Sequence, residues 1–202
     1  MSVIESALSG RIPDAALEYC IQLWQEQPFR FKLARNRASK LGDFRFDPRT
    51  KVHQVTVNSN LNPYQFLITY VHEVAHSRVH DPKRRLKPHG SHWKNEFKSL
   101  LLPLMNDQVF PDDILRPLAR HMKNPKASTA SDPVLFQSIS KYDVNNSSTR
   151  IIDLNIGDVF QLRGRSFSLI EKKRTRALCL DLTNQKRYLI SMIAEVSVIQ
   201  HV

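Results

Sequence analysis

Cysteine is scarce in this sequence, with only Cys20 and Cys179 among 202 residues. Two cysteines so far apart cannot form the dense disulfide framework that stabilises many small secreted domains. We therefore expect a fold held together by an apolar core, in a reducing compartment. The apolar share of 41% is adequate for such a core.

The sequence also lacks an apolar run of about 18 or more residues, which is the length that a membrane-spanning helix requires. Its first residues, MSVIES, do not form the basic region followed by an apolar stretch that is typical of a signal peptide. These absences predict a cytoplasmic protein that has no membrane partner.

Acidic residues are few relative to basic ones: 19 Asp and Glu stand against 30 Lys and Arg, which gives a formal net charge of +11. Such an excess favours a polyanionic partner, most often nucleic acid. The basic residues gather within 29–51, 83–87 and 163–187, and uniform clusters of this kind indicate contacts to phosphates rather than to bases. The residues that we predict to contact nucleic acid, which we expect to be DNA, are Arg35, Arg37, Lys40, Arg84, Arg85, Lys172, Lys173, Arg174 and Arg176.

The hydrophobic patterning divides the chain into two parts. Helical spacing predicts helices over 13–27, 63–79, 91–102 and 111–122, and short strands are predicted over 29–33, 42–46 and 53–57. Residues 124–150 are rich in Pro, Ser and Asn, which is typical of a linker. Five short strands then follow, over 159–162, 166–171, 176–182, 188–191 and 196–199. We expect an α+β domain over 1–123, a linker over 124–150, and a small basic all-β, barrel-like domain over 151–202.

One short motif in the sequence has specific chemistry: His72-Glu73-Val74-Ala75-His76. On a helix, residues four apart lie on the same face, so His72 and His76 can direct their imidazole nitrogens at one metal ion. Glu73 then stands beside the ion, where it can take a proton from a bound water. The segment before the motif is strongly apolar, and Asn60 or Asn62 can cap the start of its helix. A buried histidine pair needs polar partners, and a metal ion would supply them.

A catalytic zinc ion needs a third protein ligand and leaves one position open for water. His80 is eight residues from His72, roughly 12 Å along a helix, so one ion cannot be reached by both. The metzincin pattern requires Gly and His where this chain has Val79 and Pro82, which excludes that class. Glu96 has a weak case, because its spacing is one residue longer than in thermolysin-like enzymes. His89 is favoured, since the chain can turn back after Pro82, and His92 is its competitor.

The motif followed after twelve residues by Pro88-His89-Gly90-x-x-Trp93-Lys94 resembles the SprT-like family of zinc metallopeptidases, to which Spartan belongs. The resemblance covers roughly residues 12–123 and implies a zincin-like fold, with helices packed on a small sheet. It also implies that His72, His76 and His89 hold one Zn²⁺ ion. Spartan removes proteins crosslinked to DNA, so the resemblance implies DNA–protein crosslink repair. Many bacterial members end in a four-cysteine zinc ribbon, which this chain cannot form with two cysteines.

These observations predict a hydrolase: a zinc-dependent endopeptidase that acts on proteins bound or crosslinked to DNA. In this reading Glu73 is the catalytic base, which accepts a proton from the attacking water and passes it to the leaving amine. The alternative is a nucleic-acid or transcription-associated binding protein whose zinc site is structural or vestigial. A structural zinc site favours four protein ligands, often cysteines, so three histidines beside a glutamate favour catalysis.

Overall fold

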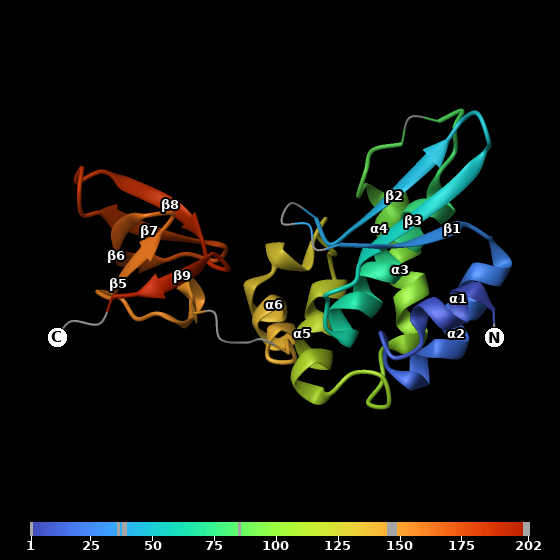
Figure 1. Cartoon of the computed structure of the whole chain (residues 1–202), viewed down its shortest axis with the longest axis horizontal. Helices are drawn as coiled ribbons and strands as arrows, with labels where there is room; N and C mark the ends of the chain where they lie inside the picture. The colour runs from blue at the N-terminus through green and yellow to red at the C-terminus, as the bar shows by residue number, and fades with distance from the viewer. Residues whose placement is uncertain (1, 36, 38–39, 85, 145–148, 200–202) are drawn as a thin grey trace. The chain divides into compact units, whose positions relative to one another are not determined.

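The chain folds into two compact units, residues 1–125 and residues 126–202 (Figure 1). The computed structural model describes residues 2–35, 37, 40–84, 86–144 and 149–199. It confirms the mixed α+β class, with helices and two separate sheets. Among the residues described, no helix has the length and apolar character needed to cross a membrane.

The first unit is built on a three-stranded sheet in the order β1-β3-β2. Strand β1 (Arg30–Ala34) runs parallel to β3 (Val52–Asn58), and β2 (Gly42–Asp47) runs antiparallel to β3. Because side chains alternate between the faces of a strand, each strand directs its larger apolar residues to one side. Phe31 packs against Phe66 and Tyr70 on the helical side, and Val55 and Val57 are fully buried.

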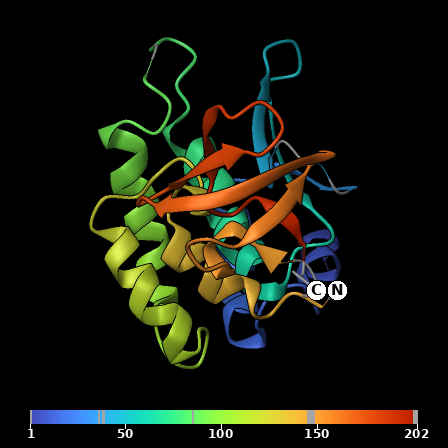
Figure 2. The same ribbon diagram turned by 90° about the vertical axis from the view of Figure 1, so that its left-hand side faces the viewer.

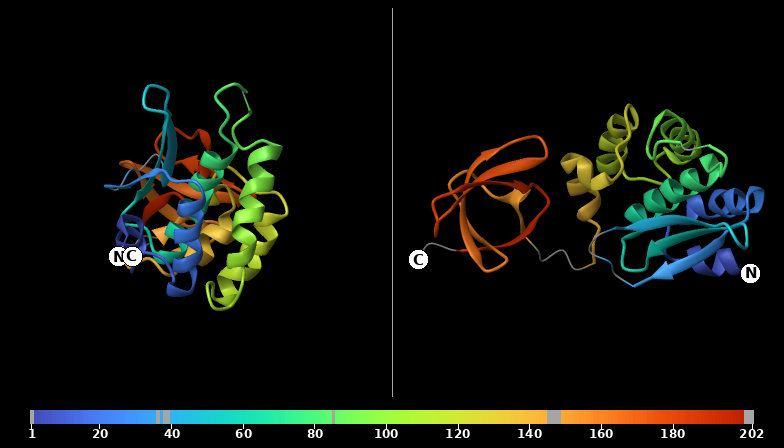
Figure 3. Two further views of the ribbon diagram at one scale, coloured as in Figure 1. Left: turned by 90° about the vertical axis from the view of Figure 1, so that its right-hand side faces the viewer. Right: turned by 90° about the horizontal axis from the view of Figure 1, so that it is seen from above.

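Helix α3 (Pro63–Val79) occupies the centre of that helical side and has the bounds that the sequence predicts. Asn62 caps its first turn, since its side-chain oxygen accepts a hydrogen bond from the backbone N–H of Gln65 at 3.0 Å, and Pro63 opens the helix. Helices α1 (Val3–Leu8) and α2 (Asp14–Glu26) lie on the same side of the sheet, as the view from above shows (Figure 3). The hydroxyl of Tyr70 donates to the backbone oxygen of Cys20 at 2.9 Å, which ties α3 to α2.

The helical layer is completed by α4 (Ser91–Leu101), the short 3₁₀ turn η1 (Leu102–Leu104) and α5 (Asp112–Met122). Helix α4 presents an apolar face that includes Trp93 and Phe97, both almost fully buried. This face packs against α3, so the start of α4 is brought to the middle of the long helix.

The stretch 124–150 was expected to be a linker, and this expectation is wrong for much of its length. It contains the 3₁₀ turn η2 (Thr129–Ser131) and helix α6 (Pro133–Ser140), and the second unit already begins at Lys126. Asp132 caps α6 by accepting from the N–H of Leu135 at 3.3 Å, and Leu135 and Ile139 are buried. Ser, Asp and Pro favour helix starts as well as turns, so the composition that suggested a linker also fits a capped short helix.

The rest of the second unit is an all-β domain with a six-stranded sheet, ordered β4-β9-β5-β6-β7-β8 (Figure 2). Its strands are β4 (Thr149–Arg150), β5 (Val159–Leu162), β6 (Arg165–Lys172), β7 (Arg176–Asp181), β8 (Arg187–Ser191) and β9 (Glu195–Val198), with the 3₁₀ turn η3 (Ile151–Asp153) after β4. Its core includes Phe160, Phe167 and Leu169. The five strands after residue 151 are confirmed, but the barrel is not. The sheet is open among the residues described, because the outer strands β4 and β8 are not paired with each other and β4 is only two residues long.

Candidate metal centre

Helix α3 places His72 and His76 one turn apart on its half-buried face. Their Nε2 atoms are 3.2 Å apart. Both imidazole rings contact Trp93 of α4 and His89 of the segment that joins the two helices. The pair therefore points away from the sheet-facing side of α3, where Phe66 and Tyr70 contact β1.

His89 reaches the same point from the turn that precedes α4. Its Nε2 lies 2.9 Å from that of His76 and 3.2 Å from that of His72. The backbone of His89 is left-handed, with a φ of 55°, a conformation that residues other than glycine rarely adopt. Gly90 follows in a tight turn, where an added Cβ would lie 2.9 Å from the backbone oxygen of Lys87. The turn thus requires glycine directly after the histidine, which is a physical reason for the His-Gly pair.

The three Nε2 atoms form a triangle that fits a metal ion. All three offered atoms lie within 4.8 Å of one another, and His72, His76 and His89 could hold an ion. Tetrahedral ligands at 2.0–2.1 Å are about 3.3 Å apart, close to the 2.9–3.2 Å that separates these nitrogens. The group formed by the described residues offers three ligands, so a fourth position would have no protein ligand from it.

The protonation of the three rings agrees with metal binding. Burial lowers the pKa of His72 well below its usual value, and the neighbouring His76, His89 and His121 act in the same direction. Burial, followed by the charge of His89, lowers the pKa of His76 to about 4, and burial lowers that of His89. Neutral imidazole has a free nitrogen lone pair and is the form that binds metals. Three lone pairs that converge at about 3 Å repel one another unless a cation or a shared proton lies between them.

Trp93 forms a common support under the three histidines. Its ring centroid is 4.6 Å from that of His72, 5.3 Å from that of His76 and 4.6 Å from that of His89. Its Nε1–H donates to the backbone oxygen of His72 at 3.3 Å, and its other contacts include a stacked Phe97 at 5.0 Å. Sequence reasoning placed Trp93 on the apolar face of a helix and missed this role. Its position four residues after His89, in the first turn of the helix that follows, is the signal that could have revealed it.

Glu73 follows the first histidine but is directed at the sheet. It is 6% exposed, and an added Cβ on Gly42 would lie 2.9 Å from both its Cγ and its Oε1. Burial raises the pKa of Glu73 to about 8, and the charge of Asp43 acts in the same direction, whereas a hydrogen bond from the backbone N–H of Phe44 opposes the rise. The carboxylate therefore lies between the metal helix and β2, in contact with the strand backbone.

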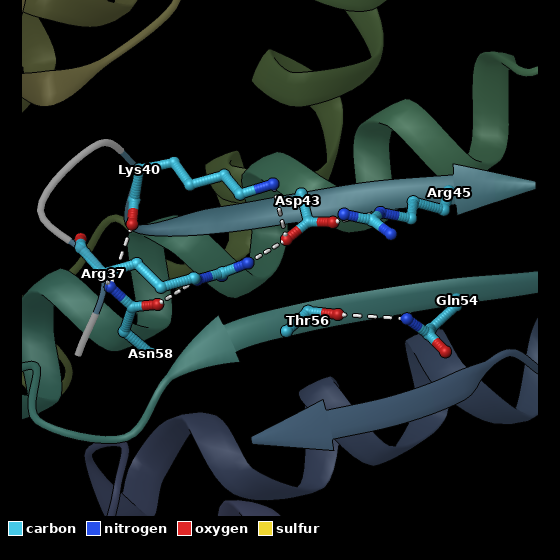
Figure 4. A network of polar contacts seen from close by, with 7 residues as sticks. All are labelled: Arg37, Lys40, Asp43, Arg45, Gln54, Thr56 and Asn58. Carbon is cyan, nitrogen blue, oxygen red and sulfur yellow. Dashed lines mark hydrogen bonds and ion pairs between the residues drawn. The ribbon is translucent and has the colours of Figure 1, made fainter. Parts of the chain in front are cut away.

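A polar network holds the start of β2 beside this glutamate (Figure 4). Asp43 accepts from Arg37, from Lys40 at 3.3 Å and from the Nε of Arg45 at 2.9 Å. The Nε of Arg37 also donates to the side-chain oxygen of Asn58 at 2.8 Å. Partial burial alone would raise the pKa of Asp43, but the hydrogen bonds and charges of Arg37 and Lys40 bring it below its usual value.

The other candidate ligands lie outside the metal centre. His92 is exposed on the first turn of α4, and Glu96 is one turn further along the helix. His80 ends α3 and packs between Phe44 and Phe46 at ring distances of 5.4 and 4.6 Å. Among the residues that the structure describes, His72, His76 and His89 are the only group of His, Cys, Asp or Glu side chains that could hold a metal ion.

The predicted nucleic-acid residues of the first unit differ in their surroundings. Arg37 and Lys40 are bound in the network around the β2 carboxylate and are only partly exposed. Arg35 and Arg84 are exposed in loops. Arg85 lies outside the described residues. Of this group, Arg35 and Arg84 therefore have the greater exposure to solvent.

The predicted residues of the second unit lie on β6, at the start of β7 and in the turn between these strands. Lys172 donates to a backbone oxygen at 2.8 Å, and Arg176 donates to another at 3.4 Å. Lys173 lies 3.7 Å from a neighbouring carboxylate, with both side chains about half exposed. Arg174 is exposed at the turn. All four side chains are exposed, so the structure brings them together at one end of the sheet.

Comparisons with known proteins do not assign a function to this site. A scan against models of protein families, a search of curated proteins and a search of solved structures each found no match. The function must therefore be argued from the residues of this chain.

Proposed function

We propose that this chain is a zinc-dependent endopeptidase of the SprT-like family. The observation that carries the proposal is the convergence of three histidine Nε2 atoms within 3.2 Å of one another, next to a buried glutamate on the same helix. The pattern of a His-Glu-x-x-His helix with a His-Gly-x-x-Trp turn is the one that the family shares. Three protein ligands without a fourth suit a catalytic zinc site better than a structural site, which is usually closed by four protein ligands.

The chemistry of the proposed reaction is divided between the ion and the chain. Zinc bound by His72, His76 and His89 would lower the pKa of a coordinated water and polarise the peptide carbonyl. In its ionised form, which a cation at the three histidines would favour, Glu73 accepts the proton of the attacking water and then donates it to the nitrogen of the leaving amine. Its contact with the backbone of Gly42 and Phe44 limits the positions that its carboxyl group can take.

Strand β2 offers a place for the substrate backbone. It is an outer strand of the sheet, and it borders the glutamate. The backbone N–H of Asn58 donates to the backbone oxygen of Leu41 at 2.9 Å, so the odd-numbered residues of β2 pair with β3 and the even-numbered ones direct their N–H and C=O groups outward. Among these, the N–H of Phe44 is bonded to Glu73. An extended peptide that adds to this edge would pass alongside Glu73.

The proposed substrates are proteins that are bound or crosslinked to DNA. The support is the net charge of +11 and its concentration in clusters, together with the family resemblance. The second candidate is a nucleic-acid-binding module in which zinc serves only the fold. The three-histidine group, which has no fourth protein ligand among the described residues, and the buried glutamate next to His72 in the chain favour the peptidase.

Glu73→Gln tests the proposal most directly. The variant should keep one equivalent of zinc and lose cleavage of a denatured protein substrate, because the amide cannot accept the proton of water. His89→Ala should lose the metal, and the matched control His92→Ala, on the exposed side of α4, should keep both metal and activity. Cleavage by Glu73→Gln at the wild-type rate would refute the proposed role of Glu73, and retention of zinc by His89→Ala would refute the ligand set.

A further inference from the structure

The three-stranded sheet has a second face, which points away from the helices. Phe31, Val55 and Val57 face the helices, so their neighbours along each strand face the other way. Arg30 and Lys32 on β1 are exposed on this outer face. In the first unit the described helices all lie on the opposite side, and the strands form an outer layer (Figure 3).

Strand register aligns the polar side chains of this outer face in rows. Arg30 and Arg45 both pair with Gln54, one from each side, so the three residues form a row across the sheet. Lys32 and Asp43 both pair with the next outward residue of β3, Thr56, and form a second row. With strands about 4.8 Å apart, the Cα atoms of Arg30 and Arg45 are roughly 10 Å apart, with a hydrogen-bonding amide between them.

The first row opens into a hollow at the turn between β2 and β3. Its volume is about 410 Å³, and Arg30, Arg45 and Arg49 line it together with Asp47. The side chain of Arg45 is 68% exposed and that of Arg49 is 92% exposed. Each also binds a carboxylate, since the Nε of Arg45 donates to Asp43 at 2.9 Å and the Nε of Arg49 lies 3.9 Å from Asp47. Asp43, the other carboxylate on this face, is already neutralised by Arg37 and Lys40. The net charge of the surface is therefore strongly positive.

We propose that this outer face binds the sugar-phosphate backbone of nucleic acid through Arg30, Arg45 and Arg49. The inference deepens the proposed function and rests on it for the role of DNA. Guanidinium groups match phosphate oxygens in charge and geometry.

The composition of the face favours nucleic acid over an acidic protein. Stable protein interfaces have an apolar or aromatic centre. Among the outward-facing residues of the three strands that the structure describes, only Val52 and Ala34 are apolar and none is aromatic, while Phe46 and Pro48 contribute to the lining of the hollow.

The position of the face connects it with the metal centre through one strand. Residues 42 and 44 of β2 contact Glu73, while Asp43 and Arg45 of the same strand project from the outer face. Nucleic acid bound there would lie across the sheet from the metal ligands. A protein attached to that nucleic acid could then reach the edge of β2 from the side.

The test compares two triple variants of the full chain that lose the same charge. Arg30→Gln/Arg45→Gln/Arg49→Gln removes the proposed contacts, and Arg116→Gln/Arg120→Gln/Lys123→Gln removes three exposed cations of α5 and its C-cap. Binding of a fluorescein-labelled 30-base-pair duplex is followed by anisotropy from 50 to 300 mM salt, with the same single strand and poly-glutamate as further probes. Three lost phosphate contacts should lower the slope of log K against log salt by about 2.7, and weaken binding at 0.15 M salt roughly 100-fold.

The control variant should bind the duplex within a few-fold of wild type. An equal loss in both variants would overturn the proposal, because the effect would then follow net charge alone. An unchanged salt slope in the Arg30/Arg45/Arg49 variant would also overturn the proposal. Loss of all affinity in Lys173→Gln/Arg174→Gln/Arg176→Gln, on the second unit, would overturn it as well. Tighter binding of poly-glutamate than of the duplex, lost in the sheet variant, would identify an acidic protein instead. Wild-type cleavage by Glu73→Gln would refute the peptidase and leave these binding results unaffected.

Discussion

Replacing Gly42 with alanine should disable Glu73 without emptying the metal centre. The new Cβ would lie 2.9 Å from the Cγ and Oε1 of Glu73 and 2.7 Å from the Cγ2 of Thr69, so the helix or the strand must move. An extra methyl group in a packed interior costs about 1–3 kcal/mol, which corresponds to a fall in melting temperature of about 3–10 °C for a unit of this size. A displacement of the carboxylate by about 1 Å should slow cleavage on the order of 100-fold.

The assay combines zinc content, thermal unfolding and cleavage of a denatured protein, for Gly42→Ala alone and together with Thr69→Ser. The serine keeps the hydroxyl that donates to the backbone oxygen of Gln65 at 2.7 Å and removes the clashing methyl group. The double variant should regain part of the lost stability but little activity, because the clash with Glu73 remains. Zinc content should stay at the wild-type level in both. Full activity and stability in Gly42→Ala would refute the packing of Glu73 against β2.

Three further predictions follow from contacts described above. Cobalt bound at the three histidines should quench the fluorescence of Trp93, because the centroid of its ring lies within 5.3 Å of that of each imidazole. The quenching should persist in Trp24→Phe and vanish in Trp93→Phe, and the reverse pattern would contradict this geometry. Asp43→Asn should cost about 1–2 kcal/mol at pH 7 in urea unfolding. The pKa of Asp43 is lower in the folded than in the unfolded chain, so the stabilisation is present above the unfolded pKa near 3.9 and is lost as the pH falls through the folded pKa. If Asp43→Asn cost the same free energy of unfolding at pH 7 and at pH 2.5, this role of the carboxylate would be refuted. Asp132→Ala should destabilise the second unit by about 1 kcal/mol through loss of the α6 cap, and unchanged unfolding would argue against that cap.

Local signals in the sequence were sufficient to predict those elements whose position depends only on neighbouring residues. Asn62, Pro63 and the apolar run after them define α3 from its first residue, because cap and helix start are set by neighbours in the chain. The spacing of His72 and His76 likewise fixes their separation on one face. The approach of His89 follows from helix α3 ending before Pro82 and from a turn that only glycine permits at position 90.

Features that depend on distant pairing could not be predicted in the same way. Arg37 and Lys40 look like free phosphate ligands in the sequence, yet the register of β2 on β3 brings them to Asp43 and Asn58. Barrel closure depends on whether two edge strands meet, and strand patterns do not contain that information. The burial of Leu135 and Ile139, which stabilises α6, depends on partners elsewhere in the second unit.

The left-handed turn at His89 has a consequence for how the ion is acquired. The hydrogen bond from the N–H of Gly90 to the backbone oxygen of Lys87 at 3.0 Å, and the ring of Trp93 at 4.6 Å, fix the third imidazole as the chain folds. The conformational entropy of that side chain is therefore lost during folding, and little remains to be lost when an ion arrives. A centre organised in this way should load within the time that the ion needs to shed its water, without a slow rearrangement of the chain.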